Sequence, residues 1–279
     1  MIDVHYRGRL GNNLFQYCLG RILAEELGFK LKAGANPGFP NTAQEVPGAC
    51  HTEPEQVLTG QRIDFGSILA DRSPRRLVLH GYFQQIEYYQ PYRDRIRHWL
   101  ALDPAIRIPA MKPDLVIHVR RKDYVAYGWA LPFSYYEEAI QRVLPPGGNI
   151  WIATDDHRDP FFWRFKHWKP NFFHGTALEN IAFLMNAPRL VLSPSSFSWW
   201  AAFLGDCQEV VAPVSGYGLW SCDPESANLI DHDRFMCIEC PEPYQPTGAE
   251  KIYHQGRSLR LRFVQKLNRD LNFSLPEQY

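Results

Sequence analysis

Apolar and polar positions alternate along the chain in patterns that predict strands and helices in turn. A first strand is predicted at residues 2–6. After a glycine-rich turn, apolar side chains recur three or four positions apart and predict an amphipathic helix that ends at Gly28. Residues 34–75 are rich in Gly, Pro, Asn and Thr and predict irregular loops. A strand at 76–83 and an aromatic helical stretch towards residue 100 complete this first block.

The second half of the chain alternates strands and helices more regularly. A capping box formed by Ser134 and Glu137 is expected to open a helix that runs to Val143. Alternation of this kind is typical of a parallel sheet covered on both faces, so we expect an α/β protein with two Rossmann-like halves. The proline-containing segment 103–113 is the predicted linker, which places the domains at residues 1–110 and 111–279. The predicted strands are 115–119, 150–153, 189–192 and 209–212, and the other predicted helices are 178–185 and 197–204.

Composition narrows the class of protein. Of the 279 residues, 45% are hydrophobic, which is enough for a large core, and the formal net charge is zero. A nucleic-acid-binding protein usually carries a basic surplus, so nucleic acid is not an expected partner. The first residues lack the order of a signal peptide, and no stretch approaches the roughly 18 apolar residues of a membrane span. We therefore expect a cytoplasmic protein without a membrane span, and leave peripheral membrane contact open.

Polar clusters follow three of the predicted strands in the second half. They occupy residues 118–124, 154–156 and 193–200. In an open α/β sheet, ligands bind at the carboxyl ends of the strands. We expect the three clusters to lie together at that edge and to form a binding site.

The side chains in these clusters suit an anionic ligand. Arg120 and Arg121 carry planar guanidinium groups that match a phosphate, although both could equally be solvated or paired with Asp123 and the turn at 155–156. Ser195 or Ser196 begins a helix, where free backbone N–H groups favour phosphate, although a serine there also serves as a simple cap.

Metal binding is not expected. The Asp155 and Asp156 carboxylates are interpreted as turn or ion-pair groups beside the arginines rather than as metal ligands. Cys237 and Cys240 have the spacing of metal ligands, but the sequence contains no second pair of this kind to complete a four-ligand site. Cys222 or His232 could contribute a further ligand. Free thiols are the expected state.

A turn in the first half is also a candidate for ligand contact. Gly8 and Gly11 allow the backbone to approach a ligand closely, and Asn12 adds an amide. The dinucleotide pattern Gly-x-Gly-x-x-Gly is absent from this turn, which argues against an NAD-dependent oxidoreductase. Alternatively, the two glycines only allow the chain to turn from the strand into the helix.

The motifs taken together resemble a known family. The segments GRLGNNLFQY at 8–17, GYFQ at 81–84, HVRRKDY at 118–124, TDD at 154–156, LM at 184–185 and SSFSWW at 195–200 occur in the order seen in the α-1,2-fucosyltransferases of glycosyltransferase family 11. The resemblance spans residues 6–240. Lys122 replaces a common glycine, Ile181 stands where an acid is frequent, and residues from 243 onward have no counterpart.

The resemblance implies a GT-B fold, in which two Rossmann-like domains face each other across a cleft. It implies GDP-β-L-fucose as donor, a galactose-containing oligosaccharide as acceptor, an inverting reaction that gives an α-1,2 linkage, and no metal or other cofactor. Residues 1–110 would be the acceptor side, and 111–279 the GDP-fucose-binding domain with a C-terminal extension.

The resemblance also assigns site residues. Arg120 is the expected catalytic group, because a fixed cation at the β-phosphate stabilises the charge that grows as fucose leaves, and Asn12 is expected to assist. The expected donor-side residues are His118, Arg120, Arg121, Asp155, Ser195, Ser196, Phe197 and Ser198, and the expected fucose and acceptor-side residues are Gly8, Gly11, Asn12, Tyr82 and Gln84.

The general base is left unassigned. Asp123, His5 and Glu87 are candidates, and a dissociative reaction could use only Asn12 and water. Two other readings stay open. The same fold could use another GDP-sugar or acceptor hydroxyl, or it could be a binding protein for GDP or glycans without activity.

Overall fold

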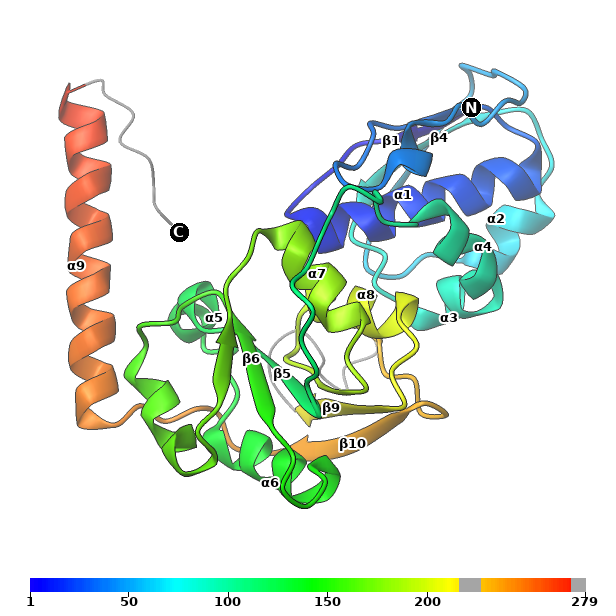
Figure 1. Ribbon diagram of the computed structural model, residues 1–279. Coiled ribbons are helices and arrows are strands. Elements are labelled where there is room, and N and C mark those ends of the chain that lie inside the picture. Colours follow the sequence, from blue (N-terminus) through cyan, green and yellow to red (C-terminus); the bar gives the residue numbers. More distant parts are fainter. Residues whose placement is uncertain (216–226, 272–279) are drawn as a thin grey trace.

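The computed structural model describes residues 1–215 and 227–271, and these form two parallel β-sheets with helices packed against them (Figure 1). In the first sheet the strands lie in the order β2-β1-β4-β3, and every pairing is parallel. Its strands are β1 (Ile2–Val4), β2 (Leu31–Lys32), β3 (Glu55–Gly60) and β4 (Arg76–Gly81).

The second sheet has the order β10-β9-β8-β5-β6-β7, again with parallel pairings. Counted along the chain from β7, this is the order third, second, first, fourth, fifth, sixth, which is that of the dinucleotide-binding Rossmann fold. The expected α/β class is confirmed. The strands are β5 (Leu115–Val119), β6 (Ile150–Thr154), β7 (Asn171–Phe173), β8 (Arg189–Val191), β9 (Glu209–Ser215) and β10 (Phe235–Cys240).

Helix α1 (Leu10–Leu27) follows β1 and is buried along most of its length. It ends as predicted at Gly28, which adopts the left-handed conformation (φ 69°) that favours glycine at a helix terminus. The rest of the first half contains short helices: α2 (Phe65–Ala70), α3 (Ile86–Tyr89) and α4 (Arg93–Trp99), with the 3-10 segments η1 (Pro40–Ala43) and η2 (Gln90–Tyr92).

Helix α8 (Ser196–Leu204) joins the two halves. The rings of Trp199 and Trp200 pack against Phe15 of α1, with ring centroids 4.9 and 4.6 Å apart, and the indole N–H of Trp200 donates to the carbonyl of Gly11 at 2.8 Å. Both tryptophans are fully buried. The core therefore runs continuously from one sheet to the other.

The remaining elements surround the second sheet. Helix α9 (Gly248–Leu271) is the longest helix of the described residues and stands beside this part of the molecule (Figure 1). None of the described helices has both the length and the apolar character needed to cross a membrane. The other elements are α5 (Lys122–Tyr127), α6 (Phe133–Val143), α7 (Ala177–Met185) and the 3-10 segment η3 (Pro160–Trp168).

Two local predictions were wrong. Residues 34–75, predicted as loops, contain η1, β3 and α2. The predicted capping box at Ser134 does not form, because α6 begins after Pro132 and has no side-chain cap; a capping box instead joins Thr176 and Glu179 at the start of α7. The sheets are connected by residues 101–114, which contain no helix or strand, and the domain boundary predicted at 110/111 falls in this segment.

Candidate functional site

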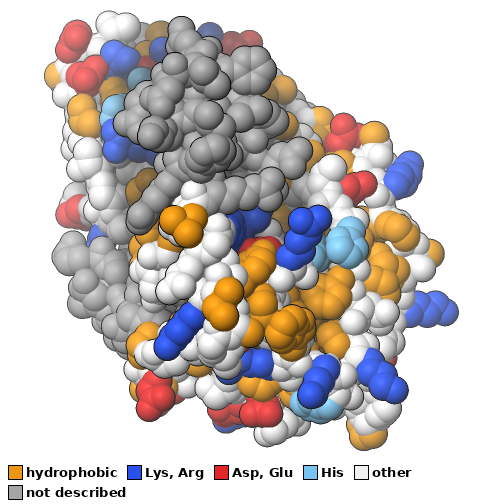
Figure 2. Space-filling model, turned by 90° about the vertical axis from the view of Figure 1, so that its left-hand side faces the viewer, with side chains coloured by type: hydrophobic (Ala, Val, Ile, Leu, Met, Phe, Trp, Pro, Cys, Tyr) orange, Lys and Arg blue, Asp and Glu red, His pale blue; other side chains and the backbone are white. Residues whose placement is uncertain are grey.

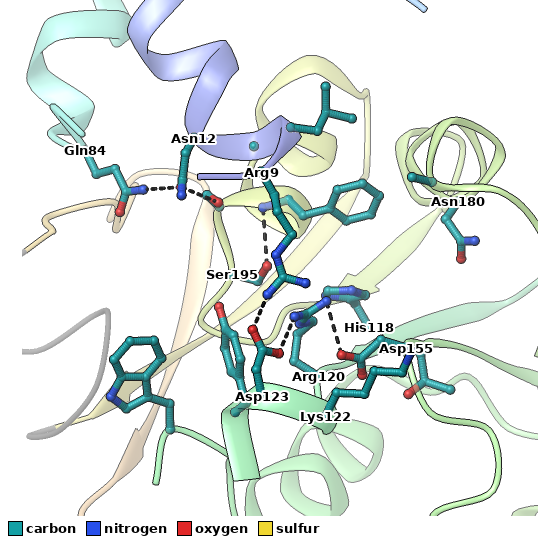
Figure 3. Close-up of a pocket in the computed structure, with 18 of the residues that line it drawn as sticks. Arg9, Asn12, Gln84, His118, Arg120, Lys122, Asp123, Asp155, Asn180 and Ser195 are labelled. Atoms are coloured by element: carbon teal, nitrogen blue, oxygen red, sulfur yellow. Dashed lines mark hydrogen bonds and ion pairs between the residues drawn. The ribbon is translucent and has the colours of Figure 1, made fainter. Parts of the chain in front are cut away.

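A cavity of about 650 Å³ lies between the two halves, at the carboxyl ends of strands from both sheets (Figure 3). On the second sheet it lies beside β5 and β8, where the strand order reverses and where Rossmann folds bind their ligands. The first half contributes Arg9, Leu10, Gly11, Asn12, Gln61, Tyr82 and Gln84, and the second half contributes His118, Arg120, Lys122, Asp123, Tyr124, Trp129, Thr154, Asp155, His157, Gly175, Ala177, Asn180, Ser195, Ser196 and Phe197.

Arg120 supplies a positive charge to the cavity wall. Its guanidinium lies 2.5 Å from Asp123 and 3.2 Å from Asp155, and stacks over the ring of Tyr124 at 4.9 Å (Figure 3). The side chain keeps 14% of its surface exposed, and its Nε has no hydrogen-bond partner among the described residues. The ion pairs considered from the sequence are therefore present, and the guanidinium still faces the cavity.

Asp123 is held by both halves of the molecule. One carboxylate oxygen accepts from Arg120 and the other from Arg9, which precedes α1 (Figure 3). Of the other candidate bases, His5 lies 3.6 Å from Asp3 and Glu87 lies 3.7 Å from Arg62, and neither lines the cavity. Asp123 is thus the one candidate base that the cavity brings next to Arg120.

Helices α1 and α8 both begin at the cavity. Ser195 caps α8 by accepting from the backbone N–H of Phe197 at 3.3 Å. The Oδ1 atom of Asn12 accepts from Ser196 at 3.0 Å and from Gln84 at 2.8 Å, so one amide joins the two halves. The partial positive charge of a helix N-terminus favours an anion at this point.

The close contact between these helices depends on Gly11. A Cβ atom at this position would lie 2.6 Å from Ser196 Oγ and 2.8 Å from the backbone nitrogen of Phe197. Glycine is therefore required by the approach of α8, whereas the sequence suggested the approach of a ligand.

His118 is a buried, neutral member of the cavity wall. Burial, and secondarily the charge of Arg120, lowers its pKa from 6.5 to about 3. Its Nδ1 lies 2.8 Å from the hydroxyl of Ser193, and its ring lies 5.7 Å from that of Phe197. At neutral pH the imidazole can form hydrogen bonds but adds no charge.

Three predicted site residues lie outside the cavity lining. Arg121 has 1% of its side chain exposed and pairs with Asp159 at 2.7 Å, between the rings of Phe161 and Tyr244 at 4.0 and 4.2 Å. The prediction that it holds phosphate beside Arg120 is corrected, because its guanidinium is buried against Asp159 and these two rings and does not face the cavity.

Ser198 and Gly8 have structural roles instead. The hydroxyl of Ser198 is fully buried and donates to the carbonyls of Ser193 and Ser195 at 3.1 and 3.3 Å. Gly8 has φ 82°, and a Cβ atom there would overlap the amide of Asn12 at 2.2 Å. Gly8 thus makes room for Asn12 without lining the cavity itself.

The cavity also contains residues that sequence reasoning did not assign. Lys122 lies beside Asp155, and burial lowers the pKa of its ammonium group. Ile181, the other noted departure from the family pattern, is a fully buried residue of α7 and does not line the cavity. The unassigned lining residues with polar or aromatic side chains are Arg9, Gln61, Lys122, Tyr124, Trp129, Thr154, His157 and Asn180. Of these, Arg9, Lys122, Tyr124 and Thr154 lie within motifs that the sequence singled out for this site.

Potential metal ligands do not converge in the part of the chain that the structure describes: no group of three or more His, Cys, Asp or Glu side chains is arranged to hold an ion. Cys237 and Cys240 are free thiols on β10, and Cys222 lies outside the described residues. Asp155 and Asp156 face in different directions, since only Asp155 lines the cavity.

Comparison with known proteins gives one lead to function. No family model matches the chain. The chain is 29% identical to a galactoside 2-alpha-L-fucosyltransferase of Caenorhabditis elegans over a segment that covers 42% of this chain. That segment spans about a third (36%) of the worm protein's length.

Proposed function

We propose that the protein is a fucosyltransferase that moves L-fucose from GDP-β-L-fucose to the 2-hydroxyl of a galactose residue on a glycan, with inversion to an α-1,2 linkage. The similarity to a galactoside 2-alpha-L-fucosyltransferase supports the sugar and the acceptor. The position of Arg120 beside the start of α8 supports the nucleotide diphosphate.

The observation that carries the proposal is this paired arrangement of guanidinium and helix N-terminus. As the bond from fucose C1 to the β-phosphate oxygen breaks, negative charge accumulates on the diphosphate. Donors already fixed in a cavity stabilise that charge more than the ground state, which is the requirement for acceleration. Arg120 is held in place by Asp123 and Asp155 before any ligand binds. Positive charge from Arg120 and α8 would serve without a metal cofactor.

The two halves take different parts of the reaction in this proposal, as in a GT-B enzyme. The second half would bind GDP along β5, β8 and α8. The first half would present Asn12, Tyr82 and Gln84 to the fucose and the acceptor. Asn12 already connects Gln84 to Ser196, so it lies where the two substrates would meet.

Asp123 is the proposed base for the acceptor hydroxyl. Its carboxylate is bound by Arg9 and Arg120, so one oxygen would have to exchange a guanidinium for the hydroxyl when the substrates bind. Arg9 is the more exposed of the two arginines, at 69% against 14%, and is the one expected to move.

The test is transfer by Arg120→Ala and Arg120→Lys variants, measured with GDP-fucose and a panel of galactosides by mass spectrometry, with product NMR for the linkage. We expect Arg120→Ala to lose about 10²–10³ in kcat, typical of removing one such donor, and Arg120→Lys to recover part of it. Wild-type transfer by Arg120→Ala would refute the proposal. GDP binding by calorimetry without turnover on any acceptor would favour a binding protein, and preference for another GDP-sugar would change the donor.

A further inference from the structure

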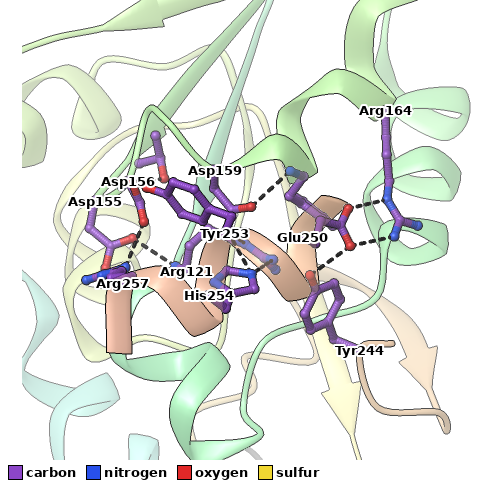
Figure 4. A network of polar contacts seen from close by, with 12 residues as sticks. Arg121, Asp155, Asp156, Asp159, Arg164, Tyr244, Glu250, Tyr253, His254 and Arg257 are labelled. Carbon is purple, nitrogen blue, oxygen red and sulfur yellow. Dashed lines mark hydrogen bonds and ion pairs between the residues drawn. The ribbon is translucent and has the colours of Figure 1, made fainter. Parts of the chain in front are cut away.

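Two pairs of neighbouring residues share one pattern at the edge of the second sheet. Arg120 and Arg121 follow β5, and Asp155 and Asp156 follow β6. In each pair the first side chain lines the cavity and the second faces away from it, towards α9 (Figures 3 and 4). The cavity and α9 therefore lie on opposite sides of the same two turns.

Helix α9 binds both oxygens of Asp156. The hydroxyl of Tyr253 donates to Oδ1 at 2.8 Å, and Nη1 of Arg257 donates to Oδ2 at 2.7 Å (Figure 4). Tyr253 and Arg257 are four residues apart and so lie on one face of the helix. Asp156 is 8% exposed, which makes these contacts stronger than ion pairs in open water.

A second set of contacts attaches the same helix to Arg121. Nε2 of His254 lies 3.5 Å from Asp159 Oδ2 and 3.5 Å from a nitrogen of Arg121. Near the start of α9, both oxygens of Glu250 accept from Arg164 at 2.9 Å, and one also accepts from Tyr244 (Figure 4).

The carboxylates that face α9 are covered by these contacts. Asp156 is 8% exposed and Asp159 1%, and Glu250, which belongs to α9 itself, is also 1% exposed. Figure 2 shows the side of the molecule on which α9 stands, where hydrophobic and basic side chains are mixed and most of the visible acidic side chains lie near the edges. Asp156 and Asp159 are therefore partners of this helix rather than of solvent.

Asp155, the neighbour of Asp156 in the chain, connects the contacts of α9 to the cavity. Asp155 Oδ1 accepts from the backbone N–H of Arg121 at 2.8 Å, and its Oδ2 lies 3.2 Å from the guanidinium of Arg120. A shift of the turn at 155–156 would therefore move a carboxylate that holds Arg120. Such a shift is opposed by the two donors on α9.

We propose that α9 is a positioning element for the cavity, in which Tyr253 and Arg257 grip Asp156 and thereby fix Asp155 and the guanidinium of Arg120. The expected effect on kcat rests on the proposed function, because it assumes that Arg120 acts on the diphosphate. Tyr253 and Arg257 do not line the cavity, so they act through Asp156.

The kinetic experiment compares Tyr253→Phe, Arg257→Ala and Arg257→Lys in the full chain, with GDP-fucose and a galactoside acceptor. We expect Arg257→Ala to lower kcat about 10- to 100-fold, because displacing a reacting group by about 1 Å can cost about 10²-fold. The KM for the acceptor should stay within about twofold of wild type, since no cavity contact changes. Arg257→Lys should recover part of kcat, and Lys251→Ala, an exposed residue of the same helix, should match wild type.

A second measurement does not depend on activity. Hydrogen–deuterium exchange should become faster in residues 118–124 and 152–158 in Arg257→Ala and Tyr253→Phe, but not in Lys251→Ala. Wild-type kcat together with wild-type exchange in both variants would overturn the inference. If the wild-type protein transfers no fucose to any acceptor, the proposed function fails, and the exchange result alone decides whether α9 positions these turns.

Discussion

Arg120 and Arg121 are adjacent in sequence but occupy very different electrostatic environments. Arg120 is beside a cavity, where its two carboxylate partners also reach solvent or ligand. Arg121 is enclosed between two rings and neutralises Asp159, whose side chain is fully buried. Removing Arg121 would leave the buried Asp159 carboxylate without the guanidinium that neutralises its charge.

Arg121→Ala should therefore lower the free energy of unfolding by about 3–5 kcal/mol, whereas Arg120→Ala should cost much less. Urea denaturation of both variants would measure the difference. Combining Arg121→Met with Asp159→Asn removes the uncompensated charge and should restore part of the loss. Equal destabilisation by the two single alanine variants would contradict the distinction.

His118 makes stability depend on pH. Its folded pKa of about 3 lies below the ordinary value of 6.5, so the unfolded chain takes up a proton in this range and the folded chain does not. Above about pH 6.5 the imidazole is neutral in both the folded and the unfolded chain, and the full stability is present. Below that pH, the free energy of unfolding declines by about 1.4 kcal/mol per pH unit towards pH 3.

Urea unfolding between about pH 7 and about pH 5 should show this decline in wild type and a shallower one in His118→Gln. His98→Gln, at an exposed histidine, is the matched control and should follow wild type. An unchanged slope in His118→Gln would show that the imidazole is protonated within the fold.

At the scale of elements, the junction of α1 and α8 sets the shape of the cavity. Gly11→Ala places a methyl group against the backbone of Phe197, which has no room to move without shifting the start of α8. We expect a loss of about 1–3 kcal/mol in stability, typical of overpacking, together with weaker GDP binding.

Calorimetry with GDP and thermal unfolding would measure both effects. Gly66→Ala in α2 is the matched control, because the nearest atom to its new methyl group is 3.9 Å away. It should leave GDP binding unchanged and keep or slightly raise stability, as glycine replacements do where space and φ allow. Tolerance of Gly11→Ala in both assays would mean that the helices are not in firm contact.

The elements that could be predicted are those with a hydrophobic signature. Strands β5 and β6 are apolar runs between turn residues, and their predicted and observed bounds agree within one residue. Strand β3 was missed because it lies at a sheet edge and exposes most of its side chains, including Val57 at 51%. The start of α9 is bound through polar contacts, so no apolar stripe marked it in the sequence.

The site was predictable only in part for a related reason. Polar residues after strand ends do gather at one sheet edge, which is why Arg120, Asp155 and Ser195 could be anticipated together. Sequence alone does not show that Arg121 turns towards Asp159 and α9, since that contact joins residues far apart in the chain. The pairing of Arg9 with Asp123 is hidden for the same reason.

For the whole molecule, the continuous core couples the two halves. An interface built from large buried aromatic rings resembles a domain interior and opposes independent movement. A ligand that contacts both halves should therefore stabilise the chain as one unit.

Thermal unfolding should show one transition, and GDP at about 100 times its Kd should stabilise the protein by about 2.7 kcal/mol, which corresponds to a rise in Tm of roughly 5 °C or more. Arg120→Ala should show a smaller rise at the same concentration of GDP. Two separate transitions, of which GDP shifts only one, would contradict this coupling.

The hydrogen bond from Trp200 to the carbonyl of Gly11 also limits how such a protein can diversify. A chimera that takes its first half from another protein would need a helix with glycine at the position of Gly11. A larger residue there would push the helix away from α8, so that the indole loses its acceptor and the cavity changes shape. New acceptor preferences are therefore easier to obtain by changing side chains such as Gln61 and Tyr82 than by exchanging whole halves.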